Sequence, residues 1–157
     1  MKLHLYLVCC FLLLISGSAL ALNDSRALNS LQDASVIYDV RTAEAKKLNF
    51  ILKVISDTRE GMLEQGVKGD VIISMRGPTV KLLVADSAVG TAEERAGIKA
   101  AVESLTARGV RLEACGYALN LFALDPQDLI NGVTPIGNSL VSLIGYQNKG
   151  YAFIPMN

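Results

Sequence analysis

The sequence predicts an α/β fold with three layers, in which helices cover both faces of a mainly parallel sheet. Short apolar or β-branched runs alternate along the chain with longer segments of helical spacing. That alternation is typical of parallel strands joined by helices. The run Val71-Ile72-Ile73-Ser74-Met75 is almost entirely apolar, as expected for a strand buried on both faces. The chain shows no internal repeat, and we expect residues 35–157 to form a single domain.

Five segments have the length and composition of strands and are bounded by turn residues. The predicted strands are residues 36–40, 71–75, 110–114, 133–136 and 151–154. A sixth short apolar segment, Val80 to Val84, is compatible with either a helical turn or another strand.

Apolar residues recur with a helical period in the segments between these strands. The predicted helices are residues 43–65, 92–107, 117–124 and 138–147, with a further helix start at 125–128. Thr91 and Glu94 have the spacing of a capping box at the start of the second helix. Gly66 and Gly109 are placed to end the first and second helices.

The first 21 residues have the pattern of a secretory signal peptide. Lys2 precedes an unbroken apolar stretch from Leu5 to Ile15, and Ala19-Leu20-Ala21 has the small-x-small pattern of a cleavage site. We therefore expect cleavage near Ala21 and a periplasmic or secreted protein. An uncleaved anchor is the alternative, because residues 3–22 are nearly long enough to span a bilayer. Residues 22–34 are polar and weakly patterned, and we expect them to form a flexible lead-in.

The composition argues against several classes of function. Acidic and basic residues are equal in number, so charge gives no reason to bind nucleic acid or an anionic membrane. No later segment has the length and apolar character for stable membrane insertion. The only histidine, His4, lies in the predicted signal, which excludes a Ser-His-Asp triad, a Cys-His pair and a His-ligated metal site in the mature chain. P-loop and Rossmann glycine motifs are also absent, so we expect neither a metal nor a cofactor.

Cys115 is the only cysteine beyond the signal and the leading candidate for covalent chemistry. In an oxidising compartment it would be buried and inert, bonded to another chain, or a reactive free thiol. It follows a predicted strand and precedes a short helix, whose free N–H groups would favour the thiolate. The competing interpretation is a small buried apolar residue. If the strand alternates strictly, Glu113 is expected to point away from the thiol, although its position at a strand end leaves the direction open.

Arg76 and Gly77 follow the end of the preceding predicted strand. Sites in open α/β folds gather at the C-terminal ends of strands, so we expect Arg76, Gly77, Gly116 and Tyr117 to line a ligand pocket with Cys115. Arg76 would add positive charge, and the Tyr117 hydroxyl could donate a hydrogen bond to a sulfur group. The ordinary alternatives are a solvated charge for Arg76, a turn residue for Gly77 and a packed ring for Tyr117.

Three stretches of the chain resemble the DsrE/DsrF-like family. They are residues 70–83, residues 105–119, and residues 129–133 followed by 149–154, and their order and spacing cover most of residues 36–157. The resemblance implies a small α/β protein with a parallel five-stranded sheet that commonly forms homo- or hetero-oligomers. In several members a cysteine accepts sulfane sulfur as a persulfide and passes it to a partner. The matching residue here is Cys115, in the setting Ala114-Cys115-Gly116.

Three functions remain open at this point. In the first, an exported sulfur carrier forms a persulfide on Cys115 between a sulfur donor and an acceptor, which are proteins or small sulfur compounds. In the second, a non-catalytic homo-oligomeric module for binding or assembly contains an inert, buried Cys115. In the third, Cys115 senses redox state through an intermolecular disulfide. The chain departs from the family pattern at Arg76, where many relatives have histidine, and at Tyr117-Ala118, where an Asn-Thr pair is common.

Overall fold

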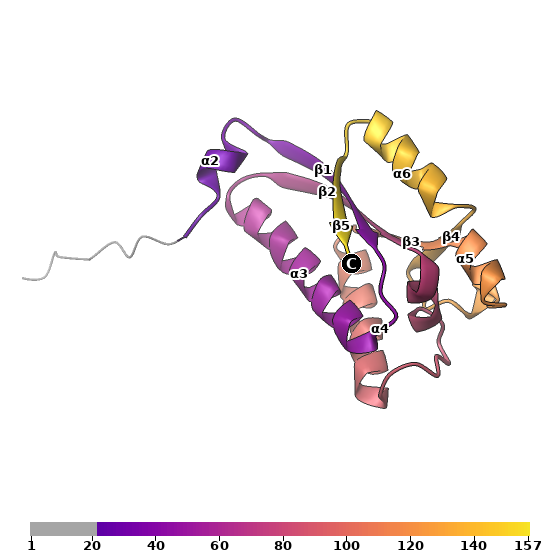
Figure 1. Ribbon diagram of the computed structural model, residues 1–157. Helices are drawn as coiled ribbons and strands as arrows, with labels where there is room; N and C mark the ends of the chain where they lie inside the picture. The colour runs from indigo at the N-terminus through magenta and orange to yellow at the C-terminus, as the bar shows by residue number, and fades with distance from the viewer. Residues whose placement is uncertain (1–21) are drawn as a thin grey trace, which may run out of the picture.

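The computed structural model describes residues 22–157, so the predicted signal peptide lies outside the described residues. Five strands form one sheet in the order β4-β3-β2-β1-β5, and every neighbouring pair is parallel (Figure 1). The strands are β1 (Asp33–Val40), β2 (Lys68–Met75), β3 (Arg111–Cys115), β4 (Val133–Ile136) and β5 (Ala152–Met156). The predicted three-layer fold with a mainly parallel sheet of about five strands is confirmed.

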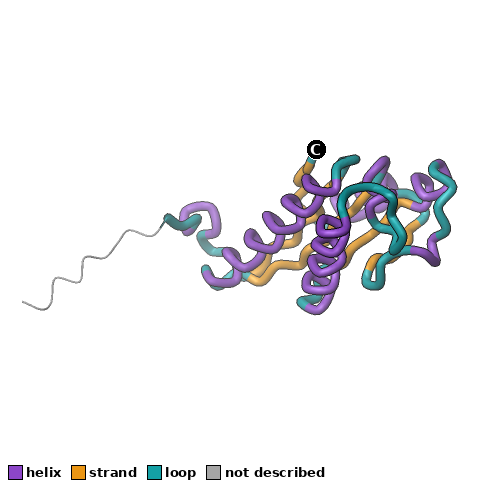
Figure 2. The backbone as a smooth tube through the Cα atoms, turned by 90° about the horizontal axis from the view of Figure 1, so that it is seen from below, coloured by secondary structure: helices purple, strands orange, loops and turns teal. Residues whose placement is uncertain are grey.

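Two long helices, α3 (Ala45–Glu64) and α4 (Ala92–Ala107), pack side by side on one face of the sheet, and α6 (Ser139–Asn148) lies on the other (Figures 1 and 2). Right-handed crossovers explain this division. The chain moves in one direction across the sheet from β1 to β4, and α6 then carries it back to β5 beside β1. Among residues 22–157, no helix is long and apolar enough to cross a bilayer.

The main core lies between the sheet and the α3–α4 layer. Each helix presents one apolar stripe at three- and four-residue intervals, as an amphipathic helix does. The buried stripe residues are Leu48, Ile51, Leu52 and Ile55 on α3, and Ile98, Val102 and Leu105 on α4. Each such side chain contributes about 2 kcal/mol when fully removed from water. This layer therefore makes the sheet a rigid platform for residues at the ends of its strands.

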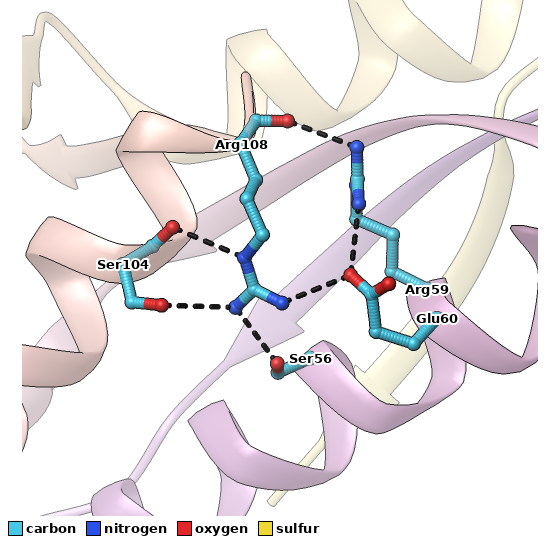
Figure 3. A network of polar contacts seen from close by, with 5 residues as sticks. All are labelled: Ser56, Arg59, Glu60, Ser104 and Arg108. Atoms are coloured by element: carbon cyan, nitrogen blue, oxygen red, sulfur yellow. Dashed lines mark hydrogen bonds and ion pairs between the residues drawn. The ribbon is translucent and has the colours of Figure 1, made fainter.

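A polar network joins the two helices at the rim of this core (Figure 3). Arg108 follows the last residue of α4 and donates to Glu60 at 2.9 Å and to Ser56 at 2.8 Å on α3. It also donates to the Ser104 carbonyl oxygen at 3.1 Å. Arg59 in turn donates to the Arg108 carbonyl oxygen at 3.0 Å, one of the acceptors that a helix end leaves unpaired. The network thus pairs carbonyl oxygens at the C-terminal end of α4 and attaches that end to α3.

The expected capping box at the start of α4 is present. The Glu94 N–H donates to Thr91 Oγ1 at 3.1 Å, and the Thr91 N–H donates to Glu94 Oε2 at 2.8 Å. These two bonds satisfy donors that the helix itself cannot pair.

The structure agrees with one of two open alternatives for residues 80–84 and differs from two other local expectations. Residues 80–84 belong largely to a 3-10 turn, η1 (Gly77–Leu82), because Gly77 adopts a positive φ of 58° and Pro78 favours a turn. Residues 125–128 contain only one such turn, η2 (Pro126–Asp128), since the chain then returns to pair Leu129 with Val84. The lead-in contains a one-turn helix, α2 (Ser25–Leu28), and the first residues of β1.

The sheet face beneath α6 carries more polar side chains than the opposite face. Its small apolar cluster consists of Ile37, Ile72 and Leu143. Nearer the C-terminal ends of the strands, register aligns Asp39, Ser74 and Glu113 across β1, β2 and β3. All three are buried, so this part of the molecule holds an inner row of polar groups below the strand ends.

Candidate functional site

Cys115 is the last residue of β3 and the N-cap of α5 (Gly116–Leu121). A Cβ at Gly116 would lie 2.6 Å from the Ile136 carbonyl oxygen and 3.3 Å from that of Gly137. Glycine therefore permits the β3–α5 turn to approach the end of β4. The Tyr117 N–H donates to the Gly137 carbonyl oxygen at 3.0 Å and closes this contact. The thiol is thereby held beside the segment that begins α6.

The N-terminus of α6 supplies a hydrogen-bond donor to the sulfur. Asn138 caps the helix, and its side-chain oxygen accepts from the Leu140 N–H at 2.9 Å. The Ser139 N–H is among the first of the helix, where no intrahelical acceptor exists. It donates instead to Cys115 Sγ at 3.4 Å. The sulfur thus lies against the positive end of a ten-residue helix.

The local environment lowers the pKa of the Cys115 thiol below its ordinary value of 9.0. Burial is the largest single influence and acts to raise the pKa. The backbone N–H groups of Ser139, Ala118 and Tyr117, together with the Ser139 hydroxyl, outweigh it. Cys115 itself is only 5% exposed. The site therefore favours the thiolate while presenting little sulfur surface to a reactant.

Met75 and Ala114 are register partners on β2 and β3. Arg76 and Cys115 are the next residues of the two parallel strands, so they lie side by side. Its guanidinium donates to both carboxylate oxygens of Asp39, at 2.7 and 2.8 Å. These hydrogen bonds are the main reason that the pKa of Arg76 is raised, and charge on Cys115 raises it further. Arg76 is therefore a fixed cation that interacts electrostatically with the sulfur.

The other predicted ligand-binding residues contribute through their backbones. Gly77 provides the positive-φ turn that ends the extended chain after Arg76. Gly116 provides the close approach described above, with no side chain to offer a ligand. Tyr117 is 68% exposed, and its effect on the thiol comes from its N–H group.

Three residues of the site were not assigned to it from the sequence: Asp39, Glu113 and Ser139. The expectation that Glu113 points away from Cys115 is wrong, because residues two apart on a strand share a face. Both side chains contact α6, with Cys115 bonded to Ser139 and Glu113 to Ser142. The period of two was a signal in the sequence that could have placed Glu113.

Glu113 anchors α6 on the sheet. Its carboxylate accepts from Ser142 Oγ at 2.5 Å and from the Tyr146 hydroxyl at 3.2 Å. Ser139, Ser142 and Tyr146 are spaced by three and four residues, so they share the face of α6 that meets β3. The Glu113 contacts that position α6 and the Ser139 contact with the sulfur thus lie on the same face of this helix.

Two further observations concern possible binding sites elsewhere in residues 22–157. Within the described part of the chain, no group of three or more acidic, cysteine or histidine side chains could hold a metal ion. A cavity of about 270 Å³ between η1 and α4, bordered by Arg95 and Lys99, includes none of the predicted site residues.

Comparison with known proteins places the chain in a family. An uncharacterized protein of Aquifex aeolicus is 27% identical over an alignment of 127 residues. The match covers 76% of this chain and 54% of that protein, so the chain spans about half the length of that relative. Among solved structures, MTH1491 of Methanobacterium thermoautotrophicum, described as of unknown function, has a TM-score of 0.65 at 20% identity, covering 78% of this chain and 99% of its own.

The ychN protein of E. coli has a TM-score of 0.58 at 20% identity, with 80% of this chain and 99% of that chain covered. At these identities the likeness establishes the fold. The family comparison reaches further, since a model of the DsrE/DsrF-like family matches residues 35–156. The chain therefore belongs to the DsrE/DsrF-like family, which is associated with sulfur relay.

Proposed function

We propose that this chain is an exported sulfur carrier that holds sulfane sulfur as a persulfide on Cys115. The observation that carries the proposal is the hydrogen bond of 3.4 Å from the Ser139 N–H at the start of α6 to Cys115 Sγ. Thiolate, and not thiol, is the nucleophile in sulfur exchange. A fold that places its one described cysteine against a helix N-terminus, with Arg76 nearby, favours that form.

The transfer needs no metal or redox cofactor. The Cys115 thiolate attacks the outer sulfur of a donor persulfide, forming a new S–S bond while the donor's S–S bond breaks. The donor leaves as a thiolate and takes up a proton from water. An acceptor thiolate then attacks the outer sulfur on Cys115, and Cys115 leaves as the thiolate. Both steps exchange one S–S bond for another, so the protein acts as a stoichiometric carrier between a donor and an acceptor.

Mass spectrometry of the chain after incubation with polysulfide tests the proposal. We expect the peptide containing Cys115 to gain the mass of one sulfur atom, and reducing agent to remove it. The Cys115→Ser variant is the matched control and should gain nothing. The folded chain should load faster than the urea-unfolded chain at equal pH, because unfolding removes the donors that favour the thiolate. A native Cys115 that stays unmodified, or reacts no faster than free cysteine, would refute the relay function.

The second candidate is a non-catalytic homo-oligomeric module. Two observations favour it: the sulfur-bearing residue is only 5% exposed, and the outer face of α6 presents Leu140, Val141 and Ile144 to solvent. Phe153 and Ile154 of the edge strand β5 are also exposed. An apolar surface of this kind is typical of a subunit interface.

The oligomeric state and the cellular phenotype of wild type, Val141→Glu and Cys115→Ser distinguish the relay function from the assembly function. Sedimentation measures the oligomeric state. The assembly function predicts an oligomer that Val141→Glu disrupts and Cys115→Ser leaves intact, with the cellular phenotype following the oligomer. The relay function predicts that Cys115→Ser abolishes the phenotype whatever its oligomeric state.

A further inference from the structure

Ser139 carries a buried hydroxyl that lacks a hydrogen-bond partner. The residue is fully buried, and within residues 22–157 no group pairs with its Oγ at hydrogen-bonding geometry. Burying an unpaired hydroxyl costs about 1–3 kcal/mol. Most buried polar groups in folded proteins are paired, so this exception calls for a physical explanation at the place where it occurs.

The explanation lies in what faces the residue. The same Ser139 already donates its backbone N–H to Cys115 Sγ at 3.4 Å. Its hydroxyl also acts on this sulfur, favouring the ionised form. A neutral thiol is a weak acceptor, whereas a charged sulfur accepts hydrogen bonds strongly. The hydroxyl is therefore left unpaired by the thiol and gains an acceptor when the sulfur becomes negative.

We propose that the hydroxyl and the backbone N–H of Ser139 form a two-donor receptor for anionic sulfur on Cys115. The ligand class is ionised sulfur covalently held at this position, either the thiolate itself or the terminal sulfur of a persulfide. The inference that the receptor binds persulfide sulfur rests on the proposed function, whereas the inference that it binds the thiolate does not.

The orientation of the receptor is set by α6, and Glu113 is its positioning residue. Through Ser142 at 2.5 Å and Tyr146 at 3.2 Å, the Glu113 carboxylate holds two residues on the α6 face that includes Ser139. The helix cannot turn about its axis without breaking these contacts. Ser139 therefore meets the sulfur with its backbone N–H already in place, and its hydroxyl gains an acceptor on ionisation while α6 keeps its position.

Other charged and titratable groups surround the sulfur and act in both directions. Arg76 approaches from the end of β2 and favours negative sulfur, but Asp39 of β1 neutralises part of its effect. Glu113 precedes the thiol on β3 and opposes a second negative charge. On α5 the nearest titratable residue is Tyr117, whose contribution comes from its N–H group. These groups are unchanged by a substitution at Ser139, which isolates the receptor.

The test compares Ser139→Ala with Ser74→Ala in the full chain. Ser74 is a matched control, because it is also fully buried with an unpaired hydroxyl but pairs in register with Glu113, two residues before Cys115. The readout is the ultraviolet absorbance of the thiolate as a function of pH, corrected with Cys115→Ser. We expect Ser139→Ala to raise the thiol pKa by about one unit, a tenfold loss in the ionisation constant. Ser74→Ala should shift the pKa by less than about 0.3 units.

A stability measurement distinguishes this role from a purely structural one. At a pH well below the thiol pKa, Ser139→Ala should unfold at the same urea concentration as wild type or a higher one, because it removes an unpaired buried hydroxyl. Above the thiol pKa it should unfold at a lower concentration. An unchanged thiol pKa, or an equal loss of stability at every pH, overturns the proposal. If Ser139→Ala raises the thiol pKa as expected but Cys115 never gains sulfur, the receptor stands and the relay function fails. If Cys115 gains sulfur but Ser139→Ala leaves the thiol pKa unchanged, the relay function stands and the receptor fails.

Discussion

Replacing Gly116 with alanine should both destabilise the chain and weaken the ionisation of Cys115. The added Cβ would lie 2.6 Å from the Ile136 carbonyl oxygen, and ordinary contact begins at 3.4 Å. The two segments must therefore separate by about 0.8 Å. The opposing atom is backbone, so no flexible side chain can move aside, and β4 is itself held by its pairing with β3.

Crowding of this kind costs roughly 1–3 kcal/mol. We expect about 2 kcal/mol, in the middle of that range, because the Tyr117 N–H must also lose or lengthen its 3.0 Å bond to the Gly137 carbonyl oxygen. This corresponds to a roughly 30-fold fall in the folding equilibrium constant. The same separation moves the start of α6 away from Cys115 Sγ, so the thiol pKa should rise toward 9.0.

Urea unfolding and thiolate absorbance measure the two effects, and Gly137→Ala is the control. A Cβ at Gly137 meets nothing within 4 Å, so this variant should change the unfolding free energy by less than about 0.5 kcal/mol. If the two alanine variants have equal stability and the same thiol pKa, the close approach at Gly116 does not hold the sulfur site together.

Three more outcomes are expected. The stability of wild type relative to Cys115→Ser should increase as pH rises from the folded thiol pKa to the unfolded value of 9.0, and should then level off. The reason is that the lowered pKa makes the folded state bind fewer protons than the unfolded state in that window. Urea titrations across pH measure this difference. Arg76→Met should cost about 2–3 kcal/mol, because the Asp39 side chain, only 5% exposed, loses its partner, while solvent partly screens the 27% exposed Arg76. It should also raise the thiol pKa, because a positive charge near the sulfur is lost. Adding Asp39→Asn should restore part of the stability. Arg108→Met should cost about 1 kcal/mol by removing the α3–α4 network, against less than about 0.5 kcal/mol for Lys53→Met at a more exposed ion pair.

The fold was predictable because its signals are local. The apolar run at residues 71–75 and the capping pattern of Thr91 and Glu94 each depend on neighbours in sequence, and both occur where expected. Each predicted strand overlaps a strand of the structure, although β1 and β2 start three residues earlier. Those first residues are mostly polar and none of them is buried, so hydrophobicity alone gives them no strand signal.

The site was predictable only in part because its contacts depend on register between distant segments. The sequence placed Arg76 and Cys115 at strand ends, but the partner of Arg76 is Asp39, 37 residues away. Likewise, Ser139 contacts a sulfur 24 residues earlier. A serine at a helix start reads as an ordinary capping residue. The cap here is Asn138, and only the three-dimensional path of α6 shows that the next residue serves the thiol.

The orientation of α6 follows from these polar contacts more than from burial of apolar surface. Its inward face carries Ser139, Ser142 and Tyr146 with only Leu143 among the buried apolar residues, while Val141, at 66% exposure, faces out. A helix placed by hydrophobic burial alone would turn its apolar side to the sheet. The buried Glu113 carboxylate and the Cys115 sulfur both require donors at that surface, and a serine-bearing face supplies them. The demand for donors at the thiol therefore also determines which side of α6 is left to meet solvent or another subunit.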